Sequence, residues 1–166
     1  VVARGMGRPC VSGSSEITID YEAKQFKADK EIIKEGEVIT IDGGSGKVVF
    51  TSDEAERLNG MMQDTILVRV ETSPEDIHGM HAAKGILTAR GGMTSHAAAV
   101  ARGMGRPCVS GSSEIDINYE QKIFKTSSIE VKEGDIITID GSTGRVILGN
   151  VPTVKPEISG DFSKLM

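Results

Sequence analysis

An internal repeat limits the folds that this chain can adopt. Val2–Ile17 recurs, residue for residue, at Val100–Ile115, an offset of 100 − 2 = 98 positions. The correspondence continues without gaps as far as Val48 and Val146, although the two copies diverge after their first stretch. An array of complete units would repeat every part of the unit, whereas here the segment between the copies occurs once. The chain therefore has the order B, A, B, with two B segments around a single A segment.

The A segment ends in a buried strand and a glycine-rich loop. Gly85–Thr88 is short and apolar, which predicts a strand, and glycines follow it. Gly91 and Gly92 allow a tight turn of the backbone and leave room for a bulky anion. Two helices are also predicted in this segment, Asp53–Asn59 and Pro74–Ala83, the second with Ile77 and Met80 towards the core.

A histidine follows the loop at the expected start of a helix. Thr94 or Ser95 can cap the alanine-rich run, which places His96 in its first turn. The unpaired N–H groups at a helix N-terminus favour an added phosphate. Arg90 and Arg102 are the nearest cations that could hold its oxygens. The pattern therefore suits a histidine that takes up a phosphoryl group.

The same pattern fits a purely structural histidine at a helix start equally well, because a lone histidine near glycines is a weak signal. His78 and His81 lie three positions apart, but no cysteine or carboxylate with ligand spacing accompanies them, which argues against zinc. Ser95 adjoins His96 without a nucleophile-elbow motif, which argues against a hydrolase. The residues by themselves thus leave a carrier and a structural role both open for His96.

The run Thr88–Gly111 closely resembles the phosphohistidine segment of the pyruvate, phosphate dikinase family. The stretches that match the family are Ile66–Asp76, Thr88–His96, Ala97–Gly111 and Gly134–Gly144. The resemblance implies an α/β (mixed α+β) fold, the swivelling β/β/α phosphohistidine domain, with an extra half-domain made mainly of β-strands. Phosphoenolpyruvate synthase shares this domain, but its loops usually differ at Met93 and Ser110.

By the same resemblance, His96 is the phosphoryl carrier. In the family, it receives a group from ATP in an ATP-grasp domain and carries it to pyruvate in a TIM-barrel domain. The residues that would support the phosphate are Arg90, Gly91, Gly92, Thr94 and Ser95. No cofactor is implied for this domain alone, whereas Mg²⁺, ATP and phosphoenolpyruvate are implied for the whole enzyme.

Thr94 matches a threonine that plant dikinases use as a regulatory phosphorylation site. A phosphate on Thr94 would put a dianion beside His96 and repel incoming phosphate. A role for Thr94 as the helix cap is the simpler expectation.

We expect three parts: residues 1–43 as a duplicated second half, residues 44–149 as the phosphohistidine domain, and residues 150–166 as a linker. Residues 44–149 can form the domain in family order, or residues 1–98 can form it as a circular permutant. The first keeps the helix after His96 continuous and is favoured. The spare half would expose strand edges. We expect it to pair with a second spare half or to swap with a neighbouring copy, giving a homo-oligomer.

The excess half-unit also suits a second class of function. An engineered or permuted scaffold of the same fold, without activity of its own, would show this pattern, and a carrier for phosphoenolpyruvate synthase would differ only in its partner domains. The chain shows neither a nucleotide-binding glycine loop nor a barrel repeat. It is therefore not expected to complete turnover alone.

Composition places the chain among soluble globular proteins. Hydrophobic residues make up 38% and charged residues 26%. The net charge of −5 argues against a nucleic-acid surface, and no run approaches the roughly 20 apolar residues of a membrane helix. Cys10 and Cys108 are equivalent positions of the repeat and are expected to be reduced. With no signal or transit peptide in view, we expect a cytoplasmic protein, with a plastid not excluded.

Overall fold

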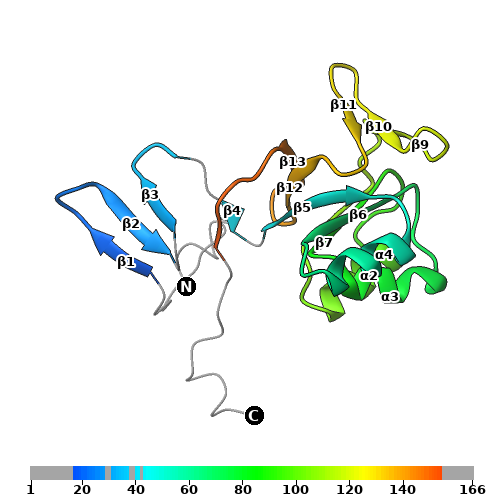
Figure 1. The fold of residues 1–166 in the computed structure, drawn as a ribbon, viewed down its shortest axis with the longest axis horizontal. Coiled ribbons are helices and arrows are strands. Elements are labelled where there is room, and N and C mark those ends of the chain that lie inside the picture. Colours follow the sequence, from blue (N-terminus) through cyan, green and yellow to red (C-terminus); the bar gives the residue numbers. More distant parts are fainter. Residues whose placement is uncertain (1–16, 29–30, 38–39, 42, 155–166) are drawn as a thin grey trace, which may run out of the picture. The chain divides into compact units, whose positions relative to one another are not determined.

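The computed structural model describes residues 17–28, 31–37, 40–41 and 43–154 (Figure 1). Two compact units divide the chain: residues 1–42 with 151–166, and residues 43–150. No helix among the described residues is long and apolar enough to cross a membrane. Cys10 lies outside the described residues.

The larger unit is built around one six-stranded sheet in the order β13-β12-β5-β6-β7-β8. Four strands run parallel, namely β5 (Gly43–Val49), β6 (Thr65–Arg69), β7 (Gly85–Thr88) and β8 (Cys108–Ser110). The antiparallel strands are β12 (Ile136–Asp140) and β13 (Arg145–Leu148). The helical elements are α2 (Ser52–Gly60), the 3₁₀ turn η1 (Pro74–Asp76), α3 (Ile77–Ala82) and α4 (His96–Gly103).

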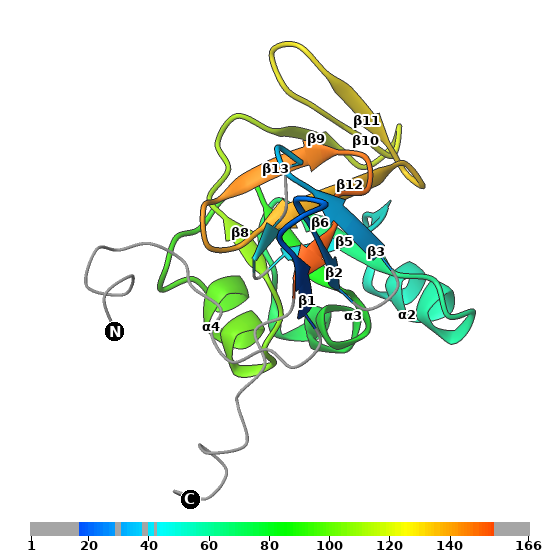
Figure 2. The same ribbon diagram turned by 90° about the vertical axis from the view of Figure 1, so that its left-hand side faces the viewer.

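Side chains alternate between the two faces of this sheet, as strand geometry requires. Val48, Ile66 and Leu87 belong to a core cluster beneath a second, three-stranded sheet. That sheet consists of β9 (Asp116–Asn118), β10 (Ile123–Lys125) and β11 (Glu130–Lys132). Val49, Leu67 and Ile86, neighbours of these positions in the same strands, belong to a second cluster with helix residues. Figures 1 and 2 show the resulting layers, with β9–β11 on one face and the helices on the other, which confirms the β/β/α fold.

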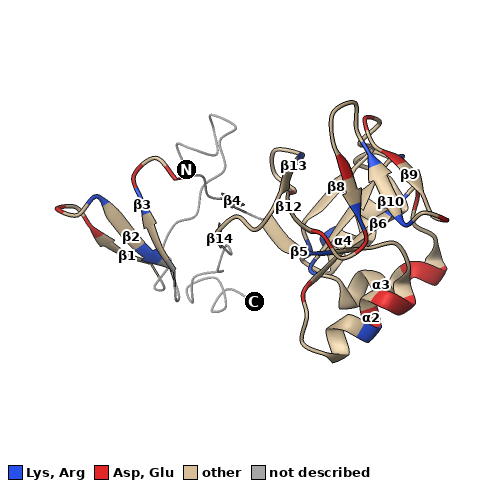
Figure 3. Ribbon diagram, turned by 45° about the horizontal axis from the view of Figure 1, so that its top comes forward, with Lys and Arg blue, Asp and Glu red and all other residues tan. Residues whose placement is uncertain are grey.

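The helix α2 carries its own start and stop signals. The Thr51 hydroxyl accepts the Glu54 N–H at 3.3 Å, which caps the helix. Asp53 and Glu54 lie in the first turn and Arg57 in the last, the charge order that the helix dipole favours (Figure 3). The second predicted helix divides into η1 and α3. Met80 is fully buried as predicted, but Ile77 is 43% exposed, so its assignment to the core was wrong.

The smaller unit contains a three-stranded antiparallel sheet, β1 (Ile17–Asp20), β2 (Gln25–Ala28) and β3 (Glu31–Lys34). These strands are the repeat counterparts of β9–β11, and the register is the same in both copies. Ile19 pairs with Phe26 as Ile117 pairs with Phe124. In the same unit, β4 (Thr40–Ile41) pairs in parallel with β14 (Thr153–Val154). Equal local sequence therefore gives equal local structure in the two copies.

The described cysteine sits in the sheet of the larger unit. Cys108 is a free thiol in β8 and is half-buried. Burial raises its pKa to about 11, and the nearby charge of Arg102 offsets only part of that rise. The thiol is therefore protonated and unreactive at neutral pH.

Candidate functional site

His96 is the first residue of α4, as the sequence predicted. Ser95 precedes it with the extended backbone of an N-cap residue, and its Oγ accepts the Ala98 N–H at 3.3 Å. Thr94 lies exposed in the turn before, so its expected role as the cap is wrong. Both hydroxyls suit the position chemically, and backbone geometry decides in favour of Ser95. The half-buried ring of His96 thus sits where the helix N–H groups are unpaired.

The imidazole of His96 is held by a threonine that the sequence analysis missed. Thr72 Oγ1 lies 3.1 Å from His96 Nδ1. A signal for this contact was present in the order of the strands. β6 and β7 are parallel neighbours, so the segments that follow them emerge at the same edge of the sheet, where α/β folds place their sites. Thr72 follows β6, and the loop before His96 follows β7.

The loop of residues 89–95, here the carrier loop, is fixed by hydrogen bonds to its backbone. Ser110 Oγ donates to the Gly92 carbonyl at 3.1 Å, and the Ser95 N–H donates to the same oxygen at 2.9 Å. Thr88 Oγ1 donates to the Arg90 carbonyl at 2.7 Å. The Arg90 N–H in turn donates to the Val70 carbonyl at 2.8 Å, which joins the carrier loop to the Thr72 segment.

The end of β8 closes against the carrier loop. Gly111 has φ +78° in a close approach to the loop backbone, since a Cβ at this position would lie 2.4 Å from the Gly91 carbonyl oxygen. Only glycine avoids that overlap and adopts this φ without strain. Gly91 itself has φ +113°, and a Cβ there would lie 2.9 Å from the Ser95 Cβ. Of the two glycines predicted as loop formers, Gly91 is required by its φ and by this contact, whereas a Cβ at Gly92 would meet nothing within 4 Å.

The three-stranded sheet β9–β11 reaches the site through Tyr119. Its hydroxyl accepts the Val70 N–H at 2.8 Å, two positions before Thr72. Its ring packs edge-on to Phe50, with centroids 6.3 Å apart, and the Arg69 guanidinium lies 5.4 Å from the ring centroid. Packing of β9–β11 therefore fixes the segment that holds His96.

Asp76 fixes the same segment from its other side. The buried carboxylate accepts hydrogen bonds from the Ser73 N–H at 2.9 Å and from Ser52 Oγ at 2.8 Å, and it lies 3.4 Å from Arg69 Nε. Burial alone would raise the pKa of Asp76, but the hydrogen bonds from Ser73 and Ser52 and the charge of Arg69 together hold it below its ordinary value. The carboxylate is therefore ionised and ties α2 and η1 to the end of β6.

The two cations predicted beside His96 lie differently. Arg102, in the last turn of α4, directs Nη2 to the Met93 carbonyl at 3.4 Å and so reaches the carrier loop. Arg90 is exposed at the start of the carrier loop. His78 is one of the two histidines considered for zinc, and its Nε2 lies 3.6 Å from Asp53 Oδ1. Among the described residues, no three His, Cys, Asp or Glu side chains come together as a metal site.

A family model described as "PEP-utilising enzyme, mobile domain" matches residues 1–46 and 61–144. The chain belongs to this family. Both copies of the repeat carry matched residues, and so does the segment that holds the carrier loop and His96. The resemblance seen in the sequence is therefore confirmed at the level of the family.

Relatives of the mobile domain are pyruvate, phosphate dikinases. The chain is 52% identical over 149 residues to the dikinase of Rhizobium meliloti (strain 1021). The match covers 90% of this chain and 16% of the relative. The chain is 53% identical over 140 residues to the dikinase of Clostridium symbiosum, covering 81% of this chain and 16% of the relative. It is 54% identical over 121 residues to the chloroplastic dikinase of Mesembryanthemum crystallinum, and this match covers 73% of this chain and 13% of the relative. The matched part thus spans only a small fraction of each dikinase.

Proposed function

We propose that this mobile domain is the phosphoryl carrier of a pyruvate, phosphate dikinase and that His96 takes up and passes on the phosphoryl group. The observation that carries the proposal is the placement of His96: it opens α4, and Thr72 holds its Nδ1 at 3.1 Å. The identity to dikinases, above 50% over most of the chain, supports the same assignment.

In this proposal the His96 Nδ1–H is the donor in the Thr72 contact, which makes Nε2 the reacting nitrogen. When the Nδ1–H donates to Thr72 Oγ1, the ring lone pair lies on Nε2. Nε2 attacks the phosphorus of phosphoenolpyruvate and forms an N–P bond, while the bond from phosphorus to the enol oxygen breaks. The leaving enolate takes a proton on carbon and becomes pyruvate. The reverse sequence returns the group, as a carrier requires.

The surroundings of His96 suit a phosphorylated ring. The N-terminal turn of α4 offers unpaired N–H groups and a partial positive charge. Gly91 and Gly92 bring backbone rather than side chains to the approach, and the proposal assigns the exposed Arg90 to the phosphate oxygens. Thr94 is exposed two residues before His96 and accessible to modification, and a phosphate there would repel the incoming group.

The donor and acceptor belong to other domains of the whole enzyme. A domain covering 16% of a dikinase leaves room for the nucleotide-binding ATP-grasp domain and the phosphoenolpyruvate-binding barrel. ATP, phosphoenolpyruvate and Mg²⁺ are held there in this proposal, and we assign no metal to the mobile domain. Its own residues supply the nucleophile, its orientation and the anion-binding helix end.

Loading and discharge of the whole chain test the proposal. The chain is incubated with phosphoenolpyruvate and the isolated barrel domain of a dikinase, and its intact mass is measured before and after pyruvate is added. We expect one acid-labile phosphoryl group per chain, which excess pyruvate removes. A folded chain that gains no phosphoryl group, or one that keeps it in excess pyruvate, would show that it is not a carrier and would favour the scaffold.

Thr72→Val should slow loading by about 5- to 10-fold, the equivalent of one hydrogen bond of roughly 1 kcal/mol. The valine keeps the shape of the side chain but leaves Nδ1 without its partner, so the proton distributes over both ring nitrogens. Nitrogen chemical shifts of His96 report this tautomer directly, and the initial loading rate reports its effect. Thr72→Ser, which restores a hydroxyl, should recover the rate. Equal rates for the valine and serine variants would remove Thr72 from the mechanism.

A further inference from the structure

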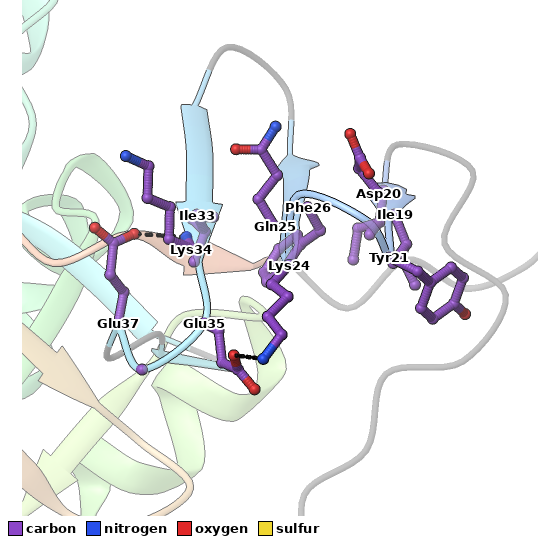
Figure 4. A pocket seen from close by; sticks show the side chains of 12 residues that line it. Ile19, Asp20, Tyr21, Lys24, Gln25, Phe26, Ile33, Lys34, Glu35 and Glu37 are labelled. Atoms are coloured by element: carbon purple, nitrogen blue, oxygen red, sulfur yellow. Dashed lines mark hydrogen bonds and ion pairs between the residues drawn. The ribbon is translucent and has the colours of Figure 1, made fainter.

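The smaller unit has a partly exposed apolar face that has the shape of a groove. Ile17, Ile19, Phe26 and Ile33 line a groove of about 580 Å³ on β1–β3, and Figure 4 shows several of these side chains together. Ile19 is 55% exposed. Apolar grooves of this kind mark binding surfaces.

The second copy of the repeat shows what covers this face. Ile115 and Phe124, the counterparts of the half-buried Ile17 and Phe26, are 7% and 2% exposed, whereas Ile33 and its counterpart Val131 are both 3% exposed. These three residues of the second copy pack in one cluster with residues of the six-stranded sheet, including Val48 and Ile137. Since the two copies share their register and nearly all of these side chains, the sheet face that seats β9–β11 is also complementary to β1–β3.

We propose that residues 17–41 can exchange with residues 115–139 on the sheet of the same chain, so that either copy completes the larger unit. The two seatings exclude each other because both use the same sheet face. The exchange concerns folding and does not depend on the proposed phosphoryl transfer.

The strand pairing of β12 with β5 supports the exchange. β12 pairs with β5 through Thr138↔Ser45 and Ile139↔Gly44. In the exchanged form, Thr138 and Ile139 are replaced by the residues 98 positions earlier in the chain. The pairs then become Thr40↔Ser45 and Ile41↔Gly44. Two residues then lie between Ile41 and Gly44, and their sequence is Asp-Gly, the dipeptide preferred in two-residue hairpin turns. The chain can therefore replace β12 in the same register without a longer connection.

The contacts that Gly134 and Tyr119 make with the larger unit have counterparts in the first copy. The Gly134 N–H donates to the Val48 carbonyl at 2.9 Å, with Gly134 at φ +90°. Gly36 occupies the equivalent turn with φ +89° and can offer the same donor. Tyr21 is the counterpart of Tyr119 and is 83% exposed, so it is available for the contacts with Val70 and Phe50.

Two differences make the observed seating the major one. Exchange removes the partner of β13, which pairs with β12 along Arg145–Leu148. It also puts Gln25 at the position of Ile123, which is 7% exposed. The exchanged form loses an edge strand and apolar burial, and it becomes visible when the second copy is disabled.

Matched charge substitutions in the two copies test the exchange. Phe124→Asp unseats β9–β11, Phe26→Asp disables the spare copy, and the double variant disables both. Unfolding is followed by circular dichroism. Limited cleavage at lysine locates the unseated copy, because Lys24, Lys27 and Lys34 are equivalent to Lys122, Lys125 and Lys132. Light scattering reports the oligomeric state.

We expect Phe124→Asp to be monomeric, because the exchange completes the larger unit within one chain, and to unfold cooperatively, with the preferred cleavage moved from the first copy to the second by at least about tenfold. Phe26→Asp should leave the larger unit unchanged, and the double variant should lose cooperative unfolding. A Phe124→Asp chain as disordered as the double variant would overturn the proposal. A dimer would also overturn it, because the first repeat copy of a second chain would then complete the six-stranded sheet.

The milder pair Phe124→Ala and Phe26→Ala applies the same test to chains that remain folded. Exchange requires Phe26→Ala to destabilise the larger unit only when Phe124→Ala is also present. Additive effects of the two alanines would overturn the proposal.

Discussion

His96→Gln is expected to abolish phosphoryl loading by phosphoenolpyruvate and the barrel domain, by at least about 1000-fold. The glutamine amide nitrogen carries no available lone pair, so it cannot form the N–P bond. The side chain is similar in length and polar, and the ring of His96 is only half-buried at the first position of α4. The free energy of unfolding should therefore change by less than about 1 kcal/mol. Intact mass and thermal melting measure the two quantities separately.

Two other histidines in the chain provide matched controls for the His96 variant. His78 and His81 lie in α3, and each can be replaced by glutamine in the same way. Both variants should load as the unchanged chain does. Acid treatment distinguishes the reacting group, because a phosphoryl group on Thr94 or Ser95 oxygen survives acid whereas one on imidazole nitrogen is lost. Acid-labile loading of His96→Gln would exclude His96 as the carrier.

The features predicted correctly from sequence are those set by neighbours along the chain. Gly85–Thr88 is buried at every position, as its short apolar pattern predicts. The helix begins at His96 because alanines follow a residue that can cap it. Its cap is Ser95 rather than Thr94, since two adjacent hydroxyls give the same chemical signal and only the backbone angles separate them. Boundaries of this kind are the least certain part of a sequence-based prediction.

The features that sequence could not give depend on tertiary neighbours. Thr72 and His96 are 24 positions apart, and their contact requires β6 and β7 to pair in parallel. The repeat makes the same point. Phe26 and Phe124 occupy the same place in the same hairpin, but Phe26 is half-buried while Phe124 lies within the core of the larger unit. Local sequence determines the hairpin, and the partner sheet determines how far this phenylalanine is buried.

Gly111→Ala is expected to lower the free energy of unfolding of the larger unit by about 3 kcal/mol and to slow loading of His96 by at least about tenfold. Part of the cost is the strained φ of +78°, about 1 kcal/mol for a residue with a Cβ. The larger part is the clash with the Gly91 carbonyl, which a Cβ would approach to 2.4 Å. Relief of that clash moves the carrier loop, and displacements of about 1 Å at a reacting group slow chemistry severely.

Gly144→Ala separates the two causes. Gly144 has a similar φ of +73°, but a Cβ at this position meets open space. This variant should lose only about 1 kcal/mol and should load at the normal rate. Denaturant unfolding and initial loading rates of the two variants make the comparison. If Gly111→Ala matched Gly144→Ala in both measurements, the close packing of β8 against the carrier loop would have no part in holding His96 in place.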